Sequence, residues 1–193
     1  MTGALMLEQN LLHHWIERAR AGDSSAFERL MLLHEKMVLR TAQRLLLNTE
    51  DAKDAAQEVF LKLYKNLGRF RDDGDLAPWL YRMTVNVCFD SKRKVKAAIP
   101  IDCAPDSHDA APDPEKTLRA AEQRRLVFSA IERLPERERA AVVLRDIEGC
   151  TTAEAAAILG SSEETVRSQI STARAKIRKF VAERLSKASG GSK

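Results

Sequence analysis

The chain has 193 residues, enough for one mid-sized domain or two small ones, and its 44% hydrophobic content can fill a core. A net charge of +4 is too small to indicate nucleic-acid binding by itself, so the distribution of charged residues along the chain is more informative than their sum. No apolar run approaches the ~18 residues of a membrane span, and no signal-like layout opens the chain. These features predict a soluble, cytoplasmic protein without membrane insertion.

Helical periodicity dominates the first half of the chain, where strand signals are nearly absent. An apolar stripe over residues 7–19 predicts a first helix, and Asp23 is placed to cap a second. Asn48 and Thr49 offer caps for a third helix, which Gly68 closes.

A fourth helix is predicted from about Asp75 to Ala98, with Pro78 tolerated in its first turn. The periodicity then vanishes over residues 99–114, which hold four prolines and four aspartates. Prolines break helices and charge opposes burial, so this stretch is predicted to be a flexible, acidic linker. A first helical domain is therefore expected over residues 1–98.

The helical pattern resumes at residue 115 and predicts a second domain over residues 115–186, with a disordered tail over residues 187–193. Its first helix should end at Leu134, before Pro135, and a short helix should follow over residues 136–148. The predicted fold class is all-α, with two small helical domains joined by a flexible linker.

Two short helices with a tight turn between them are predicted near the end of the second domain. Thr151 with Glu154, and Ser161 with Glu164, each match a capping box, and Gly160 lies between them. A small residue at the crossing and a glycine at the bend are typical of a helix-turn-helix.

The second helix of this motif carries hydroxyl and basic side chains suited to DNA. Arginine can read guanine edges in the major groove, serine and threonine can meet bases or phosphates, and a helix N-terminus favours a phosphate. The alternative is an ordinary solvated helix with a basic stripe. The residues predicted to face DNA are Ser161, Ser162, Thr165, Arg167, Ser168, Ser171, Thr172 and Lys176.

One face of the third predicted helix is polar but contains an apolar residue. Asp54, Gln57, Glu58 and Leu61 recur at helical spacing on this face. Solvated faces are usually polar, whereas an apolar residue inside a polar stripe mildly favours a protein partner. A protein-binding face is predicted here, with a plain solvated face as the alternative.

A second candidate DNA surface surrounds the start of the fourth helix. Phe70 is predicted to lie in a loop with little to pack on, and exposed aromatics beside cations suit unstacked bases. Trp79 is in such a setting more often a core residue than a ligand contact, and basic residues near a helix C-terminus also interact favourably with the helix dipole. The residues predicted for this surface are Phe70, Trp79, Tyr81, Arg82, Asn86, Lys92, Arg93 and Lys94.

The three cysteines, Cys88, Cys103 and Cys150, are widely spaced and form no CxxC pair. An odd number without framework spacing predicts free thiols in a reducing compartment, with Cys88 as a small core residue.

Several stretches together resemble an extracytoplasmic-function (ECF) sigma factor, the smallest group of the main bacterial sigma family. The carriers are GDSSAF, DAKDAAQEVFLKLYKNLGRF, PWLYRMTVNVC and LPERERAAVVLRDIEGCTTAEAAAILGSSEETVRSQISTARAKIRK, in family order. The resemblance implies two helical domains, regions 2 and 4, and three partners: core RNA polymerase, promoter DNA and an anti-sigma factor.

The same resemblance implies roles for the candidate residues. Asp54, Gln57 and Glu58 would contact the clamp helices of the polymerase. Phe70 and Asn86 would hold a flipped base of the −10 element, with Lys92, Arg93 and Lys94 on nearby backbone. Arg167, Ser168 and Ser171 would enter the major groove of the −35 element. The chain departs from the family where Glu164 replaces a common glycine, and Gln169 and Thr172 replace arginines.

Other function classes fit less of the sequence. A two-domain helix-turn-helix regulator would bind an operator without acting as a sigma subunit, but the first half lacks a phosphoacceptor α/β pattern or a ligand-pocket signature. A helical scaffold would leave the aromatic and basic placement unexplained. The four histidines have no ligand spacing, and neither a phosphate loop nor a nucleophile motif appears, so no enzymatic activity, metal or cofactor is expected.

Overall fold

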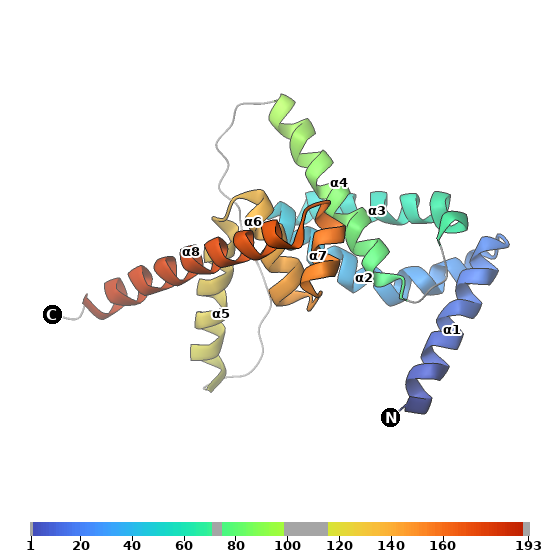
Figure 1. The fold of residues 1–193 in the computed structure, drawn as a ribbon, viewed down its shortest axis with the longest axis horizontal. Coiled ribbons are helices and arrows are strands. Elements are labelled where there is room, and N and C mark those ends of the chain that lie inside the picture. The colour runs from blue at the N-terminus through green and yellow to red at the C-terminus, as the bar shows by residue number, and fades with distance from the viewer. Residues whose placement is uncertain (1, 71–74, 99–115, 191–193) are drawn as a thin grey trace. The chain divides into compact units, whose positions relative to one another are not determined.

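The computed structural model describes residues 2–70, 75–98 and 116–190, and the regular elements in these ranges are all helical. The chain divides into two compact units, residues 1–103 and 104–193, coloured blue to green and yellow to red in Figure 1. The predicted all-α class is confirmed. The predicted linker over 99–114 lies outside the described residues.

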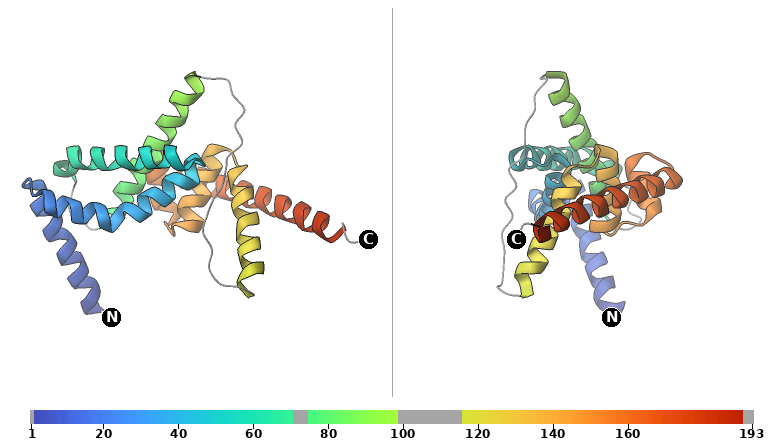
Figure 2. Two further views of the ribbon diagram at one scale, coloured as in Figure 1. Left: turned by 180° about the vertical axis from the view of Figure 1, so that it is seen from behind. Right: turned by 90° about the vertical axis from the view of Figure 1, so that its left-hand side faces the viewer.

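The first unit is built around the second of its long helices. Its elements are α1 (Thr2–Arg20), α2 (Ser24–Leu46), α3 (Thr49–Asn66), the 3-10 turn η1 (Leu67–Arg69) and α4 (Ala77–Ala98). Helix α2 packs against α1, α3 and α4, and it lies beside α3 in both Figure 1 and Figure 2. Ile16, Leu30, Leu63 and Leu80 are fully buried where these helices meet, so burial of apolar stripes holds the unit together.

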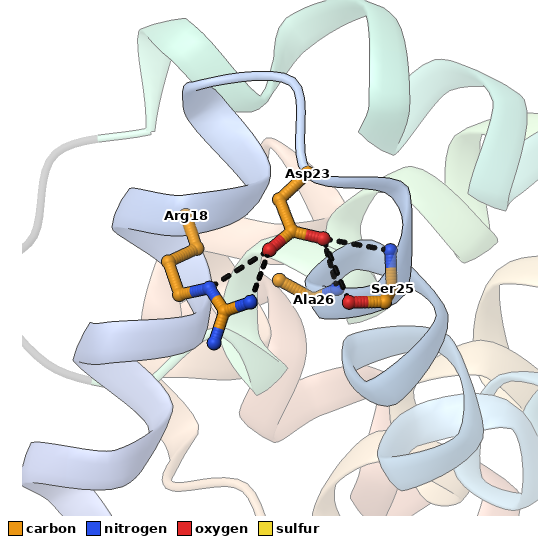
Figure 3. Close-up of polar contacts among 4 residues, drawn as sticks. All are labelled: Arg18, Asp23, Ser25 and Ala26. Carbon is orange, nitrogen blue, oxygen red and sulfur yellow. Dashed lines mark hydrogen bonds and ion pairs between the residues drawn. The ribbon is translucent and has the colours of Figure 1, made fainter.

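The predicted caps of α2 and α3 are confirmed. The Asp23 carboxylate accepts hydrogen bonds from the backbone N–H groups of Ser25 (2.9 Å) and Ala26 (3.2 Å), and from the Arg18 guanidinium (2.8 Å) of α1 (Figure 3). Asn48 accepts in the same way from the first turn of α3, at 2.8 and 3.1 Å. Such caps pair backbone donors that have no partner within the helix.

Helix α4 begins at Ala77, whose N–H donates to the Asp75 side chain at 2.9 Å, and Pro78 lies in its first turn as predicted. Helix α3 ends differently from the prediction, because Gly68 lies inside the 3-10 turn instead of stopping the helix. The chain therefore continues as a tight turn up to Phe70, whose N–H donates to the Leu67 carbonyl at 3.1 Å.

The second unit contains α5 (Lys116–Glu132), α6 (Glu136–Val142), a π-helical segment η2 (Val143–Ile147), α7 (Thr152–Leu159) and α8 (Glu163–Gly190). Helix α8 packs on α5, α6 and α7, with Val166 and Ala173 fully buried. The backbone of residues 187–190, assigned to the tail in the sequence analysis, is helical, and residues 191–193 lie outside the described part.

The segment η2 adds one residue to a helical turn between α6 and α7. The Glu148 N–H donates to the Val143 carbonyl, five residues earlier, at 2.9 Å. Residues 139–144 are consecutively buried, which a regular helix with one apolar face cannot achieve.

The first predicted capping box of the helix-turn-helix is confirmed. The Glu154 N–H donates to the Thr151 hydroxyl (3.2 Å), and the Thr151 N–H donates to the Glu154 carboxylate (2.6 Å). These hydrogen bonds lower the pKa of Glu154 below its usual value.

The second predicted box, Ser161 with Glu164, is wrong by one residue. Gly160 ends α7 in the left-handed conformation (φ 59°), and the Ser161 N–H closes this turn on the Ala156 carbonyl at 3.0 Å. Ser161 is thereby used to end α7, and Ser162 caps α8 by accepting the Thr165 N–H at 3.2 Å.

Candidate nucleic-acid and protein interfaces

The side chain of Phe70 has a partner that the sequence analysis missed. Its ring packs on the ring of Trp79, with centroids 5.4 Å apart and planes tilted by 33°. The expectation that Phe70 has little to pack on is wrong, because the turn η1 brings it to the first turn of α4. Both aromatic residues are half-buried, so part of the pair stays accessible to a ligand.

The backbone of the same turn is held by Arg20, the last residue of α1. Its guanidinium donates to the carbonyl of Leu67 at 3.2 Å and to the carbonyl of Phe70. No local sequence pattern points to Arg20, because 47 and 50 residues separate it from its two partners.

One face of α4 continues from this aromatic pair. Trp79, Arg82, Asn86 and Arg93 follow one another at intervals of three, four and seven residues, which places them on the same side of a helix. Arg82, Asn86 and Arg93 are exposed. This face, with Phe70 at its start, is called the α4 face below. It combines a stacking surface, an amide and two cations.

Two other residues predicted for this surface, Tyr81 and Lys92, lie elsewhere. Tyr81 and Lys92 are half-buried on the side of α4 that faces the core, and the Lys92 ammonium donates to the Leu45 carbonyl at 2.6 Å. This hydrogen bond pairs a carbonyl near the end of α2, so the charge of Lys92 stabilises the C-terminus of that helix. The side chain of Lys94 lies outside the described residues.

The predicted protein-binding face of α3 is exposed to solvent. Asp54 and Gln57 are exposed, Glu58 pairs with Lys62 at 2.8 Å, and Leu61 is 60% exposed. Tyr64, one turn beyond Leu61, is 59% exposed and was not predicted. Two large apolar side chains in one exposed stripe are a stronger sign of a protein partner than Leu61 alone.

The tyrosine is held in place by a second aromatic residue. The rings of Tyr64 and Phe27 meet edge to face with centroids 5.0 Å apart, so the start of α2 supports the end of α3.

In the second unit, α8 presents small hydroxyl side chains on its outer face. Ser168, Ser171 and Thr172 are exposed at helical spacing, opposite the buried Val166 and Ala173. This outer face can approach DNA closely because its side chains are short.

The remaining predicted residues flank this outer face near the start of α8. Thr165 is exposed and Ser161 half-buried, while Arg167 pairs with Glu163 of its own helix at 2.5 Å.

Two ion pairs fix α8 against the preceding elements. Arg174 donates to both carboxylate oxygens of Asp146 in η2, at 2.9 and 2.6 Å. This pairing raises the pKa of Arg174. Lys176 donates to Glu138 of α6 at 2.7 and 2.9 Å. Lys176, predicted to contact DNA, is thus partly neutralised by a neighbour within the unit.

The described thiols are buried and reduced. Cys88 lies in the core, as predicted, and burial raises the pKa of Cys150 to about 11. A thiol with this pKa stays protonated and unreactive near neutral pH. Cys103 lies outside the described residues.

Within the described ranges, no three His, Cys, Asp or Glu side chains gather closely enough to hold a metal ion. In the same ranges, no helix has the length and apolar character needed to cross a bilayer.

Each unit contains a match to one family model. Residues 30–98 match Sigma-70 region 2, and residues 124–177 match Sigma-70, region 4. The α4 face and the exposed stripe of α3 fall in the first match, and the helix-turn-helix falls in the second.

Named relatives align over most of the chain. The ECF RNA polymerase sigma factor SigM of Mycobacterium tuberculosis is 36% identical over 163 residues, which cover 83% of this chain and 80% of the relative. The RNA polymerase sigma-H factor of Pseudomonas aeruginosa is 32% identical and covers 90% of this chain and 95% of its own. The ECF RNA polymerase sigma-E factor of Escherichia coli K12 is 33% identical, with coverages of 82% and 88%.

Solved structures share the fold. CnrH, solved in complex with the cytosolic domain of CnrY, is 26% identical with a TM-score of 0.65 and covers 90% of this chain and 98% of its own. The sigma factor RpoE of Bartonella quintana, solved with the anti-sigma factor NepR, has a TM-score of 0.66 at 20% identity, with coverages of 81% and 96%. The chain belongs to the extracytoplasmic-function group of the sigma-70 family of RNA polymerase sigma factors.

Proposed function

We propose that this sigma factor binds core RNA polymerase, directs it to promoters with −35 and −10 elements, and stabilises strand separation at the −10 element. A region 2 domain over residues 1–98 would bind the polymerase and the −10 element. A region 4 domain over residues 115–186 would bind the −35 element, with the acidic linker over residues 99–114 between them.

The α4 face carries the proposal for the −10 element. Extracting a base from a duplex costs a few kcal/mol, and stacking it on an aromatic ring contributes ~1–3 kcal/mol. The half-buried ring of Phe70, supported by Trp79, supplies one such stacking surface. The exposed amide of Asn86 can pair with a base edge, and Arg82 and Arg93 can meet nearby phosphates.

The exposed stripe of α3 supports the proposal for polymerase binding. Asp54, Gln57 and Glu58 would form polar contacts around Leu61, whose 60% exposed side chain would be buried in the complex. An apolar residue at the centre with polar groups around it is the usual arrangement of a protein interface.

The outer face of α8 supports the proposal for the −35 element. Ser168, Ser171 and Thr172 would contact base edges or phosphates in the major groove, with Arg167 beside them. The hydroxyl and backbone N–H of Ser162 at the start of α8 would meet a phosphate.

Membership of the family supports proposals for how the protein is regulated and where in the cell it acts. CnrH was solved with a separate protein, the cytosolic domain of CnrY, and we propose that an anti-sigma factor binds this chain comparably. Transcription takes place in the cytoplasm, where we place the protein. The named relatives are sigma factors and not enzymes, and we propose no catalytic activity for this chain.

Co-elution with core polymerase tests the sigma assignment against an operator-binding regulator. The purified chain is expected to co-elute with core enzyme in size-exclusion chromatography at low salt and to give run-off transcripts from a cognate promoter. Free chain should bind the promoter duplex weakly. Tight operator binding without co-elution would support the regulator instead.

Base capture is tested by separating melting from polymerase binding. Phe70→Ala and Asn86→Ala are expected to lower permanganate reactivity of −10 thymines about tenfold, within the range of one stacked base. Core binding should stay unchanged. Asn10→Ala, an exposed asparagine of α1, is the matched control. Equal losses of melting and core binding would indicate misfolding and contradict the proposed role.

A further inference from the structure

The last turn of α1 is connected to the aromatic end of the α4 face. Arg20 is 23% exposed, and its guanidinium reaches across to the 3-10 turn that ends at Phe70. It donates from Nε to the Leu67 carbonyl at 3.2 Å and from Nη2 to the Phe70 carbonyl. The contact therefore joins two elements that lie far apart in the sequence.

The shape of the guanidinium matters for this contact. Its N–H groups lie in one plane, so two neighbouring donors fix the positions of two acceptor oxygens relative to each other. Here the acceptors are the carbonyl that starts the turn and the carbonyl of the residue that follows it. Partial burial shields these hydrogen bonds from competing water, which strengthens them.

Arg20 is itself held on a fixed support. Ile16 and Ala19 of the same helix are buried in the first unit, so the end of α1 cannot move independently. The Glu17 carboxylate, one turn earlier, pairs with the same guanidinium. Phe70 is thus held at its carbonyl by α1 and at its ring by Trp79 of α4.

We propose that Arg20 is a positioning residue for promoter melting, which orients Phe70 to receive an unpaired base. The inference rests on the proposed base-capturing role of Phe70. It extends the melting apparatus to α1, which precedes the residues matched by the region 2 model. A ring held in place before DNA arrives loses less conformational freedom when the base stacks on it.

The test compares Arg20→Gln, Arg20→Lys and Arg18→Gln in complexes with core polymerase. Arg20→Gln should lower permanganate reactivity at −10 thymines about tenfold, with core affinity unchanged, because charged hydrogen bonds are lost. Arg20→Lys should recover only part of this loss, since an ammonium cannot reproduce the planar fork. Arg18→Gln, which breaks the ion pair between α1 and the α2 cap Asp23 without touching the turn, should leave melting unchanged.

A double-mutant cycle separates positioning from general destabilisation. In a Phe70→Ala background, Arg20→Gln should have little further effect on melting, because no ring remains to be oriented. Additive losses, or equal losses from Arg18→Gln and Arg20→Gln, would overturn the inference.

The same cycle separates failure of the inference from failure of the proposed function. If Phe70→Ala alone leaves melting intact, the proposed role of Phe70 fails. If Phe70→Ala lowers melting and Arg20→Gln does not, only the inference about Arg20 fails.

Discussion

The two units hold their candidate DNA-contacting side chains in different ways. In the first, the central aromatic, Phe70, follows a short turn and depends on contacts from α1 and α4. In the second, the contacting side chains lie along one continuous helix that a cap and ion pairs hold in place. The first arrangement suits capture of a single displaced base, and the second suits reading an intact duplex.

This difference predicts how each unit responds to substitution. Stacking concentrates ~1–3 kcal/mol in one aromatic residue, whereas the proposed discrimination by α8 would be shared among several short side chains. Single changes on the α4 face should therefore lower melting about tenfold, and single changes on α8 should weaken binding by less.

The largest effect is expected from Arg139→Ala in the second unit. Arg139 is buried, and its guanidinium donates to the carbonyls of Glu132 and Leu134, both at 2.9 Å, at the end of α5. Leaving these two carbonyls, one buried and one partly buried, without donors should lower the free energy of unfolding of this unit by about 3 kcal/mol.

Calorimetry of the whole chain measures this change. Only the unfolding transition of the second unit should shift, since Arg139 donates to two carbonyls of that unit. Arg145→Ala, an exposed arginine of η2, is the control. A parallel shift of both transitions would contradict independent folding of the two units.

The next effect concerns polymerase binding by the first unit. Leu61→Asp should weaken core binding at least about tenfold, because a carboxylate would be buried in an apolar contact. Titration of labelled protein with core enzyme measures the affinity. Leu11→Asp, an exposed leucine of α1, should change it little. Equal losses from both variants would point to a nonspecific effect of charge.

A smaller effect distinguishes two lysines of α8. Lys176 is paired with Glu138, whereas Lys179, one turn later in α8, is exposed. Each phosphate contact contributes about 0.9 to the slope of log affinity against log salt. Lys179→Met should reduce this slope for −35 duplex binding by about that amount, and Lys176→Met should leave it unchanged. A reduced slope for Lys176→Met would show that its ion pair opens on DNA.

The smallest effect is the acid sensitivity of the cap on α2. Hydrogen bonds from Ser25 and Arg18 hold the pKa of Asp23 well below its ordinary value of 3.8. A lowered folded-state pKa stabilises the protein above pH 3.8 and loses that contribution as pH falls below it. Asp23→Asn should therefore lower the melting temperature more near neutral pH than near pH 2, where part of this contribution is already lost. An equal difference at both pH values would contradict this.

Features that depend on neighbouring residues could be predicted from the sequence. The caps at Asp23, Asn48 and Thr151 follow local rules, and all three are present. The error at Ser161 has a local cause as well, because closure of α7 by Gly160 uses the Ser161 N–H first.

Features that depend on which helices meet could not be predicted. Periodicity places Lys92 and Lys176 on helices but does not reveal the carbonyl of Leu45 or the carboxylate of Glu138 opposite them. The supports of Phe70 were missed for the same reason, since Arg20 lies 50 residues away. Candidate residues could thus be found in the sequence by their chemical type, whereas their partners could be identified only in the folded structure.

The π-helical turn at residues 143–147 places a constraint on chain length. Its extra residue rotates the side chains that follow it in this helical segment by about 100° around the helix axis. With this rotation, the carboxylate of Asp146 meets Arg174. Deleting one residue there would restore regular winding and turn the carboxylate away from its arginine. Conservative replacements in this stretch should be tolerated far better than a single-codon deletion.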